Sequence, residues 1–313
     1  MLAFITWDVS PIIAEIGPLT LRWYGLLFMS GFVVGTFVLS HIYKSEGVSP
    51  RWVDVITLYM LVGTILGARL GHVFFYDWAS YKDHPLEIFK IWHGGLASHG
   101  ATLGILLAVW LFSRNNKFDY LWTLDRIVIV VAIGGALIRM GNLMNSEIVG
   151  KPTDVPWAFV FPRDTEHLRP VGIGETLPAG ALQVMPEPGS SPMVAVPRHP
   201  TQIYEALFCV FLLIVLYAMW NRKKEHTPRG QLFGLFVVLL FSFRFLVEFL
   251  KEDQVAFERG MSLNMGQWLS LPLILVGVWV LLRAGKNPDN PYGYAPRDLN
   301  AEEAGKSSVR VKM

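Results

Sequence analysis

Five polar clusters interrupt the apolar stretches of this 313-residue sequence. They are Arg69–Asp77, His93–Gly100, Arg139–Glu147, Arg198–Glu205 and Arg244–Glu248. A charged side chain at the centre of a bilayer costs at least about 2.5–3.5 kcal/mol, so each cluster needs a partner or a task. The planar fork of arginine suits a pair of phosphate oxygens, and histidine accepts a proton near neutral pH. Residues of these types are able to bind a phosphate or to move a proton.

The densest cluster runs from Arg139 to Glu147 and contains Asn142 and Asn145. Arg139 and Asn142 are three residues apart, so they share one face of a helix. This spacing supports two interpretations equally. Either Arg139 binds a phosphate, or it reaches the interface with water and pairs with Glu147.

Two other clusters place carboxylates inside expected helices. Glu248 follows Arg244 by four residues, which predicts an ion pair along one helix face, whether structural or functional. Glu205 lies about one helical turn into lipid. The clusters at His99, Arg139 and Arg244 lie toward the same leaflet in the topology given below. We therefore expect one polar cavity.

Glycines accompany the cluster at Arg69. Those at positions 63, 67 and 71 recur every four residues and therefore lie along one helix face. This pattern allows close contact with another helix, because small residues let backbones approach. Packing explains these glycines and leaves Arg69 unexplained.

His93 and His99 flank Gly94 and Gly95, which permit the backbone geometry of a broken helix. The two histidines are six residues apart and do not share a helix face, and no His-Glu-x-x-His pattern occurs. No metal and no cofactor are therefore predicted. A histidine inside a membrane is often a hydrogen-bonding group between helices, and that alternative stays open for both.

The composition is that of a protein that crosses a membrane several times. Hydrophobic residues make up 52% of the chain and charged residues 17%, where a soluble domain has about 25% charged residues. Aromatic residues at 13%, with 11 Trp, suit anchoring at a lipid–water boundary. A net charge of +2 gives no broad basic field, so nucleic-acid binding is not expected. The single cysteine, Cys209, excludes an intrachain disulfide.

Seven stretches are long enough to span a bilayer, since a spanning helix needs about 20 apolar residues. They are residues 19–41, 52–76, 96–113, 121–141, 202–220, 231–250 and 266–283. Lys and Arg gather in the connections on one side, which predicts an outside N-terminus and a cytoplasmic C-terminus. The first stretch lacks the features of a removable signal peptide.

The expected organisation is an all-α polytopic membrane protein with a transmembrane domain over residues 1–284. Between the fourth and fifth spans, residues 146–200 are rich in proline, which predicts a small extracytoplasmic loop or head. The polar residues 285–313 predict a disordered cytoplasmic tail.

Six motifs run in one order from about residue 20 to 250. They are Arg22-Trp23-Tyr24-Gly25, Ala68-Arg69-Leu70-Gly71, His93-Gly94-Gly95 through His99-Gly100, Arg139-x-Gly141-Asn142-x-x-Asn145-x-Glu147, Arg198-His199-Pro200-Thr201-Gln202-x-Tyr204-Glu205 and Arg244-Phe245-x-x-Glu248-Phe249. In these motifs the sequence resembles the prolipoprotein diacylglyceryl transferases, the bacterial family that starts lipoprotein maturation. The stretch from Arg139 to Glu147 is the most specific of them.

The resemblance implies a seven-helix fold in the bacterial inner membrane with an external head. It implies transfer of a diacylglyceryl group from phosphatidylglycerol to the thiol of the lipobox cysteine in a prolipoprotein signal peptide, with release of glycerol phosphate. The implied catalytic residues are His99 as a base, Arg139 and Arg244 as phosphate ligands, and Glu248 as the partner that orients Arg244. The implied substrate-binding residues are Tyr24, Arg69, Arg139, Asn142, Asn145, Glu147, His199, Gln202 and Glu205.

Two positions depart from the family pattern. Leu240 stands where members often carry Tyr, and Ile138 stands where Gly is common. The residues alone also allow a transporter or channel that uses intramembrane Arg, His and Glu. That alternative predicts a pair of internal repeats, and none is evident in the sequence.

Overall fold

The computed structural model describes residues 4–17, 19–90, 94–172, 176–186, 190–252 and 261–284, so His93 and the tail 285–313 lie outside the described residues. The chain divides into two compact units. The first unit comprises Met1–Val34, Val131–Tyr217 and Gly234–Trp279, and the second comprises Gly35–Val130, Ala218–Phe233 and Val280–Met313.

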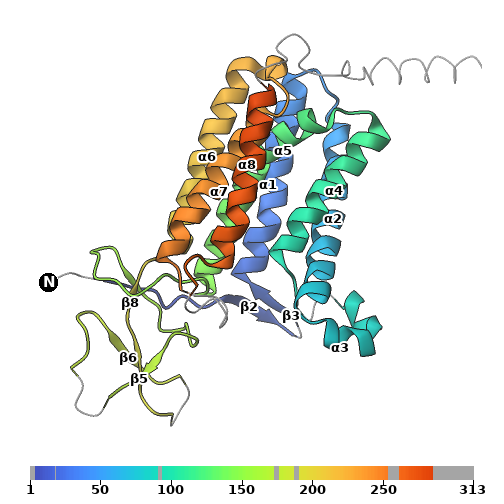
Figure 1. Cartoon of the computed structure of the whole chain (residues 1–313). Helices are drawn as coiled ribbons and strands as arrows, with labels where there is room; N and C mark the ends of the chain where they lie inside the picture. Colours follow the sequence, from blue (N-terminus) through green and yellow to red (C-terminus); the bar gives the residue numbers. More distant parts are fainter. Residues whose placement is uncertain are drawn as a thin grey trace, which may run out of the picture. The chain divides into compact units, whose positions relative to one another are not determined.

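Long helices make up most of the described chain (Figure 1). They are α1 (Trp23–Ser45), α2 (Arg51–Phe75), α4 (Ser98–Asn116), α5 (Tyr120–Met144), α6 (Thr201–Lys223), α7 (Gln231–Val247) and α8 (Met265–Ala284). The short helices are α3 (Trp78–Asp83), η1 (Pro85–Phe89), η3 (Lys224–His226) and η4 (Glu248–Leu250).

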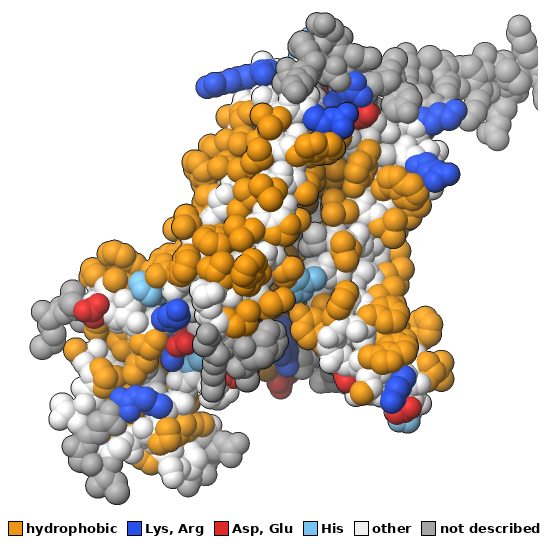
Figure 2. Space-filling model, in the orientation of Figure 1, with side chains coloured by type: hydrophobic (Ala, Val, Ile, Leu, Met, Phe, Trp, Pro, Cys, Tyr) orange, Lys and Arg blue, Asp and Glu red, His pale blue; other side chains and the backbone are white. Residues whose placement is uncertain are grey.

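Six of the described helical stretches are long and apolar enough to cross a membrane, and they begin at Trp23, Arg51, Tyr120, Thr201, Gln231 and Met265. They match six of the seven predicted spans. The first span begins later than predicted because residues 19–22 pair as a strand. On the face shown in Figure 2, apolar side chains cover the helices, as contact with lipid requires. The chain is therefore a polytopic membrane protein.

Helices α2 and α4 of the second unit pack backbone to backbone, and Figure 1 shows them side by side. A Cβ added at Gly100 would lie 2.1 Å from the carbonyl oxygen of Gly67. One added at Gly104 would lie 2.0 Å from that of Gly63. The predicted close contact along the glycine face is confirmed, and the partner helix is α4.

Gly100→Ala is expected to force α2 and α4 apart and to lower the free energy of unfolding by about 1–3 kcal/mol, as overpacking does. Thermal unfolding of the detergent-solubilised protein measures the loss. Gly134→Ala is the matched control, because a Cβ at Gly134 of α5 meets nothing within 4 Å. Equal melting temperatures for both variants would contradict this account of the contact.

Short strands, which the sequence did not predict, occur in the first unit. They are β1 (Ile5–Thr6), β2 (Ile12–Ile16), β3 (Leu19–Arg22), β4 (Phe159–Val160), β5 (Arg169–Pro170), β6 (Leu182–Val184), β7 (Met193–Ala195) and β8 (Pro197–Arg198). They form sheets in the orders β1-β4-β8 and β5-β7-β6, and β2 and β3 pair as an antiparallel hairpin. Pro170 and Pro197 lie on edge strands, where the missing N–H breaks no ladder.

A small apolar core joins the strands to the ends of two helices in the first unit. Leu143, Val149, Phe159 and Phe161 are buried together, and Ile203 of α6 packs against them. The proline-rich segment is therefore anchored where α5 ends and α6 begins.

The second unit contains a buried charge cluster that the sequence analysis did not identify. Both nitrogens Nε and Nη2 of Arg126 on α5 contact both carboxylate oxygens of Glu46, at 2.9–3.2 Å. The two side chains are fully buried. The indole Nε1 of Trp220 donates to the same carboxylate at 2.5 Å. We name Glu46, Arg126 and Trp220 the clasp.

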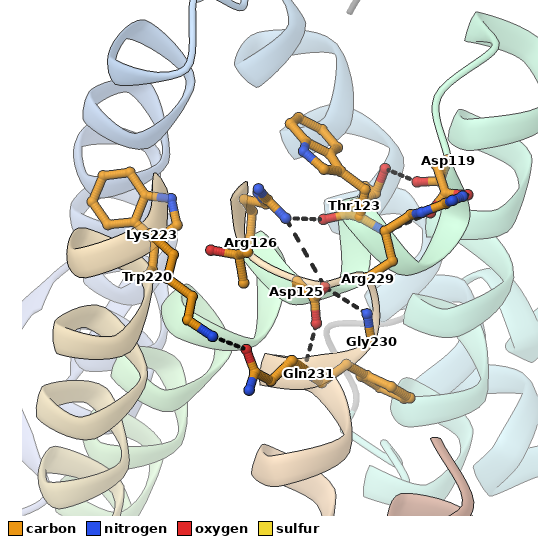
Figure 3. Close-up of polar contacts among 12 residues, drawn as sticks. Asp119, Thr123, Asp125, Arg126, Trp220, Lys223, Arg229, Gly230 and Gln231 are labelled. Atoms are coloured by element: carbon orange, nitrogen blue, oxygen red, sulfur yellow. Dashed lines mark hydrogen bonds and ion pairs between the residues drawn. The ribbon is translucent and has the colours of Figure 1, made fainter. Parts of the chain in front are cut away.

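Beside the clasp, Asp125 caps the start of α7 (Figure 3). Its carboxylate accepts hydrogen bonds from the backbone N–H groups of Gly230 at 2.7 Å and Phe233 at 2.8 Å. These N–H groups have no partner inside the helix, and the helix dipole favours negative charge there. Arg229 adds an ion pair with Asp119 at 2.9 Å.

Candidate active site

Five charged residues of the first unit form an alternating chain. Arg139 of α5 contacts Glu205 of α6 at 2.9 Å, and Lys251 contacts the other oxygen of Glu205 at 3.0 Å. Lys251 also contacts Glu248 at 3.1 Å, and Glu248 faces Arg244 of α7 at 3.7 Å. We name this set the ion chain. It links three of the predicted clusters through residues of three helices and the turn after α7.

The ion chain is buried in its middle and more open at its ends. The carboxylates and Lys251 have side chains no more than 8% exposed, whereas the side chains of Arg139 and Arg244 are 19% and 33% exposed. A buried carboxylate needs a cation beside it, because an unpaired charge at low dielectric is strongly destabilising. The two guanidinium groups are therefore the cations of the ion chain that a ligand is able to contact.

Arg139 is held from a second side by its own helix. Its Nη1 donates to Asn142 Oδ1 at 3.2 Å, so the prediction that these two residues share a face is confirmed. Asn142 in turn donates to Glu147 at 2.7 Å, and Asn145 donates to the same oxygen at 3.2 Å. The carboxylate that pairs with Arg139 is that of Glu205, and Glu147 orients the two asparagines.

A strained turn places Glu147 beside Asn142. Ser146 and Ile148 have left-handed backbones, with φ of 53° and 58°. For a β-branched residue such as Ile148 this conformation is a genuine outlier, and such residues persist only where their surroundings hold them. Thr201 Oγ1 donates to the carbonyl of Ile148 at 2.8 Å, and Gln202 Nε2 donates to that of Glu147 at 2.7 Å. Gln202 thus contacts the turn that bears the site.

Tyr24 approaches the same face of α5 at Gly141. A Cβ at Gly141 would lie 2.8 Å from the ring of Tyr24, so the glycine is needed for this approach. Tyr24 therefore lies against the helix that carries Arg139 and Asn142.

His199 stands at the start of α6, outside the apolar stretch. Its Nδ1 lies 3.2 Å from the hydroxyl of Tyr204, which also accepts a hydrogen bond from Trp157 Nε1 at 2.8 Å. Burial lowers the pKa of His199 from its ordinary value, so the ring is neutral at neutral pH. The hydrogen bonds among Trp157, Tyr204 and His199 connect the proline-rich segment 146–200 to the first turn of α6.

Arg69 is buried in the second unit, and its guanidinium contacts main-chain carbonyls. Its Nε donates to Ile88 at 2.9 Å, and Nη1 and Nη2 donate to Gly95 and Lys90, each at 3.2 Å. Gly94 and Gly95 have φ of +82° and +72°, the freedom predicted for them. Arg69 therefore holds the segment that leads into α4.

His99 lies in the first turn of α4 and is exposed. Its Nδ1 is 3.5 Å from the hydroxyl of Tyr76, a residue that ends α2. Of the three clusters predicted to share a cavity, those of Arg139 and Arg244 are linked in the first unit. His99 belongs to the second unit.

Lys251 was not among the predicted site residues, since it lies just beyond the sixth predicted span, residues 231–250. The turn η4 explains its position, because side chains three residues apart eclipse each other in a 3₁₀ helix. Glu248 and Lys251 have that spacing and meet at 3.1 Å. A lysine three residues beyond an intramembrane glutamate was the available signal.

Comparison with known proteins decides which class of protein carries this site. A model of the family described as prolipoprotein diacylglyceryl transferase matches residues 11–283. The chain belongs to this family. Its activity is diacylglyceryl transfer, and the transporter alternative is set aside.

Curated relatives cover nearly the whole chain. The chain is 40% identical to the phosphatidylglycerol–prolipoprotein diacylglyceryl transferase of Tolumonas auensis, over 90% of this chain and 97% of that protein. Proteins of the same name from Chloroherpeton thalassium and Porphyromonas gingivalis are also 40% identical, over 91% of this chain and 96% of each relative. The family match includes every residue of the ion chain.

Proposed function

We propose that the chain transfers the diacylglyceryl group of phosphatidylglycerol to the thiol of a lipobox cysteine in a prolipoprotein signal peptide. The products are a thioether and glycerol phosphate. The observation that carries the proposal is the pair of arginines, Arg139 and Arg244, each held by a buried carboxylate and each still partly exposed. Two such forks suit the oxygens of one phosphodiester.

In the transfer, a carbon–sulfur bond forms and the bond between the glycerol carbon and the phosphate oxygen breaks. The thiol, with a reference pKa near 8.5, must lose its proton, and the leaving phosphate gains negative charge. Arg139 and Arg244 stabilise that charge, because cations in a site of low dielectric act strongly on it. Asn142, Asn145 and Glu147 bind the glycerol head or hold Arg139 in place.

His99 is proposed as the base that takes the thiol proton, since histidine accepts a proton at neutral pH. Tyr24 lines the cavity for the lipid head. His199, Gln202 and Glu205 complete the substrate site of the first unit, and their contacts described above support a role in shaping it. For Arg69 of the second unit, the family motif supports the proposal that it binds substrate.

The proposed setting is the bacterial inner membrane, with the N-terminus outside and the C-terminus in the cytoplasm. Helix α4 is proposed as the seventh span, because its glycine face lies directly on α2. In this topology the proline-rich segment 146–200 is an extracytoplasmic head.

The purified protein, supplied with labelled phosphatidylglycerol and a lipobox peptide, tests the function. Mass spectrometry is expected to show peptide that gains the diacylglyceryl mass at its cysteine. A peptide with serine in place of cysteine is the control, and it should stay unmodified. Intact lipid and unmodified cysteine peptide after long incubation would refute the proposal.

His99→Gln is expected to lower kcat by about 10²–10⁴-fold, the range of general-base catalysis, while the protein stays folded. Raising the pH should restore part of the rate, because hydroxide then forms the thiolate that the base no longer provides. The pH profiles of the wild type and the variant measure this. An unchanged rate would leave His99 with a positioning role only.

A further inference from the structure

Lys251 is the most enclosed charged group of the ion chain. The residue is 2% exposed, and its Nζ lies between Glu205 Oε1 at 3.0 Å and Glu248 Oε1 at 3.1 Å. Burying a lysine is costly unless it is paired and hydrogen-bonded, and here both partners are buried carboxylates. Each of these two carboxylates also pairs with one arginine, so a carboxylate stands between Lys251 and each guanidinium group.

The backbone fixes this lysine independently of its charge. Lys251 forms an isolated antiparallel bridge with Gly150, and its N–H donates to the carbonyl of Glu248 at 3.3 Å. Next to this bridge, Lys151 N donates to Leu250 O at 2.7 Å. These backbone contacts therefore fix the position of the ammonium group between the two glutamates.

The charges of the ion chain explain how a lysine at this position affects the two arginines. Three cations face two carboxylates, so one net positive charge remains. Without the lysine, each arginine would pair with one carboxylate, and the net charge that the cluster presents to a phosphate would be zero. With it, each glutamate divides its negative charge between an arginine and the lysine, which leaves the exposed guanidinium groups positive.

We propose that Lys251 is a positioning residue for the transferase: it holds Glu205 and Glu248 so that Arg139 and Arg244 keep a net positive charge and a set spacing for the phosphate. The inference rests on the function proposed above and adds a residue to it. Lys251 touches no reacting atom in this account and acts through the two carboxylates.

Lys251→Met keeps the length of the side chain and removes its charge. It is expected to lower kcat/KM for phosphatidylglycerol by about 10²-fold, as misplacement of catalytic groups does. The KM for the lipobox peptide is expected to change less than about threefold, because the ion chain serves the phosphate. Lys151→Met is the matched control, since Lys151 follows Gly150, the bridge partner of Lys251, and the one contact described for its side chain is with the carbonyl of Phe249 at 3.1 Å.

A second variant separates charge from packing. Lys251→Met with Glu248→Gln removes one charge of each sign, restores the net positive charge and leaves the contact of Arg139 with Glu205 intact. This double variant is expected to be about tenfold more active than Lys251→Met, because coupled charges are not additive. A role in folding alone would not produce that recovery.

The activities of the two variants and of the wild type distinguish failure of the Lys251 proposal from failure of the proposed function. Wild-type kcat/KM in Lys251→Met, or a double variant no more active than the single one, overturns the proposal for Lys251. If Lys251→Met does not insert, the double variant is compared with the wild type, and a loss beyond about 10²-fold overturns it. Absence of transfer by the wild type would instead refute the proposed function.

Discussion

Arg139→Ala is expected to lower diacylglyceryl transfer by about 10³-fold or more while the protein remains folded and inserted. The physical reason is the loss of a cation where negative charge develops, which costs about 10²–10³-fold for a single donor in other enzymes. A further loss follows because Glu205 and Asn142 lose the guanidinium that they hold. Single-turnover assays with labelled phosphatidylglycerol measure the rate.

Two variants make this prediction specific to the site. Arg163→Ala is the matched control, because Arg163 belongs to the same unit and, among the described residues, pairs with the exposed Asp8, so its loss should leave the rate unchanged. Arg139→Lys keeps the charge and loses the fork that contacts Glu205 and Asn142 together, so an intermediate rate is expected. Transfer at the wild-type rate in Arg139→Ala membranes would show that the phosphate is bound elsewhere.

Local spacing explains which contacts of the site were predictable. Arg139 with Asn142 and Arg244 with Glu248 follow from helix geometry, since residues three and four apart share a face. The partnership of Arg139 with Glu205 depends on how α5 packs on α6, and no spacing within one helix contains that information. Single-sequence patterns therefore identified the charged clusters and missed how they are joined.

The same limit applies to the fold. The apolar stretches predicted seven spans, because a helix that crosses lipid needs its own length of apolar residues, and six of them match helices of the described residues. The short strands of the proline-rich segment 146–200 escaped prediction, because strands of two or three residues carry no periodicity. Arg126 was a missed signal: a charge inside a predicted span requires a buried partner, and Glu46 lies beyond the end of the first span.

The clasp supports the second prediction with a large effect. Glu46→Gln is expected to lower the free energy of unfolding by about 3–5 kcal/mol, because the fully buried Arg126 loses its closest counter-charge and keeps only Asp125 at 4.0 Å. Trp220 keeps an acceptor in the amide oxygen, so the loss is chiefly electrostatic. Thermal and denaturant unfolding in detergent measure the change, and the transfer rate per folded molecule should stay near that of the wild type.

Two comparisons show whether the loss of stability in Glu46→Gln comes from the lost counter-charge of Arg126. One breaks an exposed ion pair, and the other removes the charges of both Glu46 and Arg126. Glu225→Gln breaks only the exposed contact with His226, so we expect almost no change in stability. The double variant Glu46→Leu, Arg126→Met removes the charges of Glu46 and Arg126, and it should recover part of the loss because the remaining carboxylate, Asp125, keeps its hydrogen bonds from the backbone N–H groups that start α7. A double variant less stable than Glu46→Gln would mean that the clasp acts through packing and hydrogen bonds to Trp220 and not through the pairing of its charges.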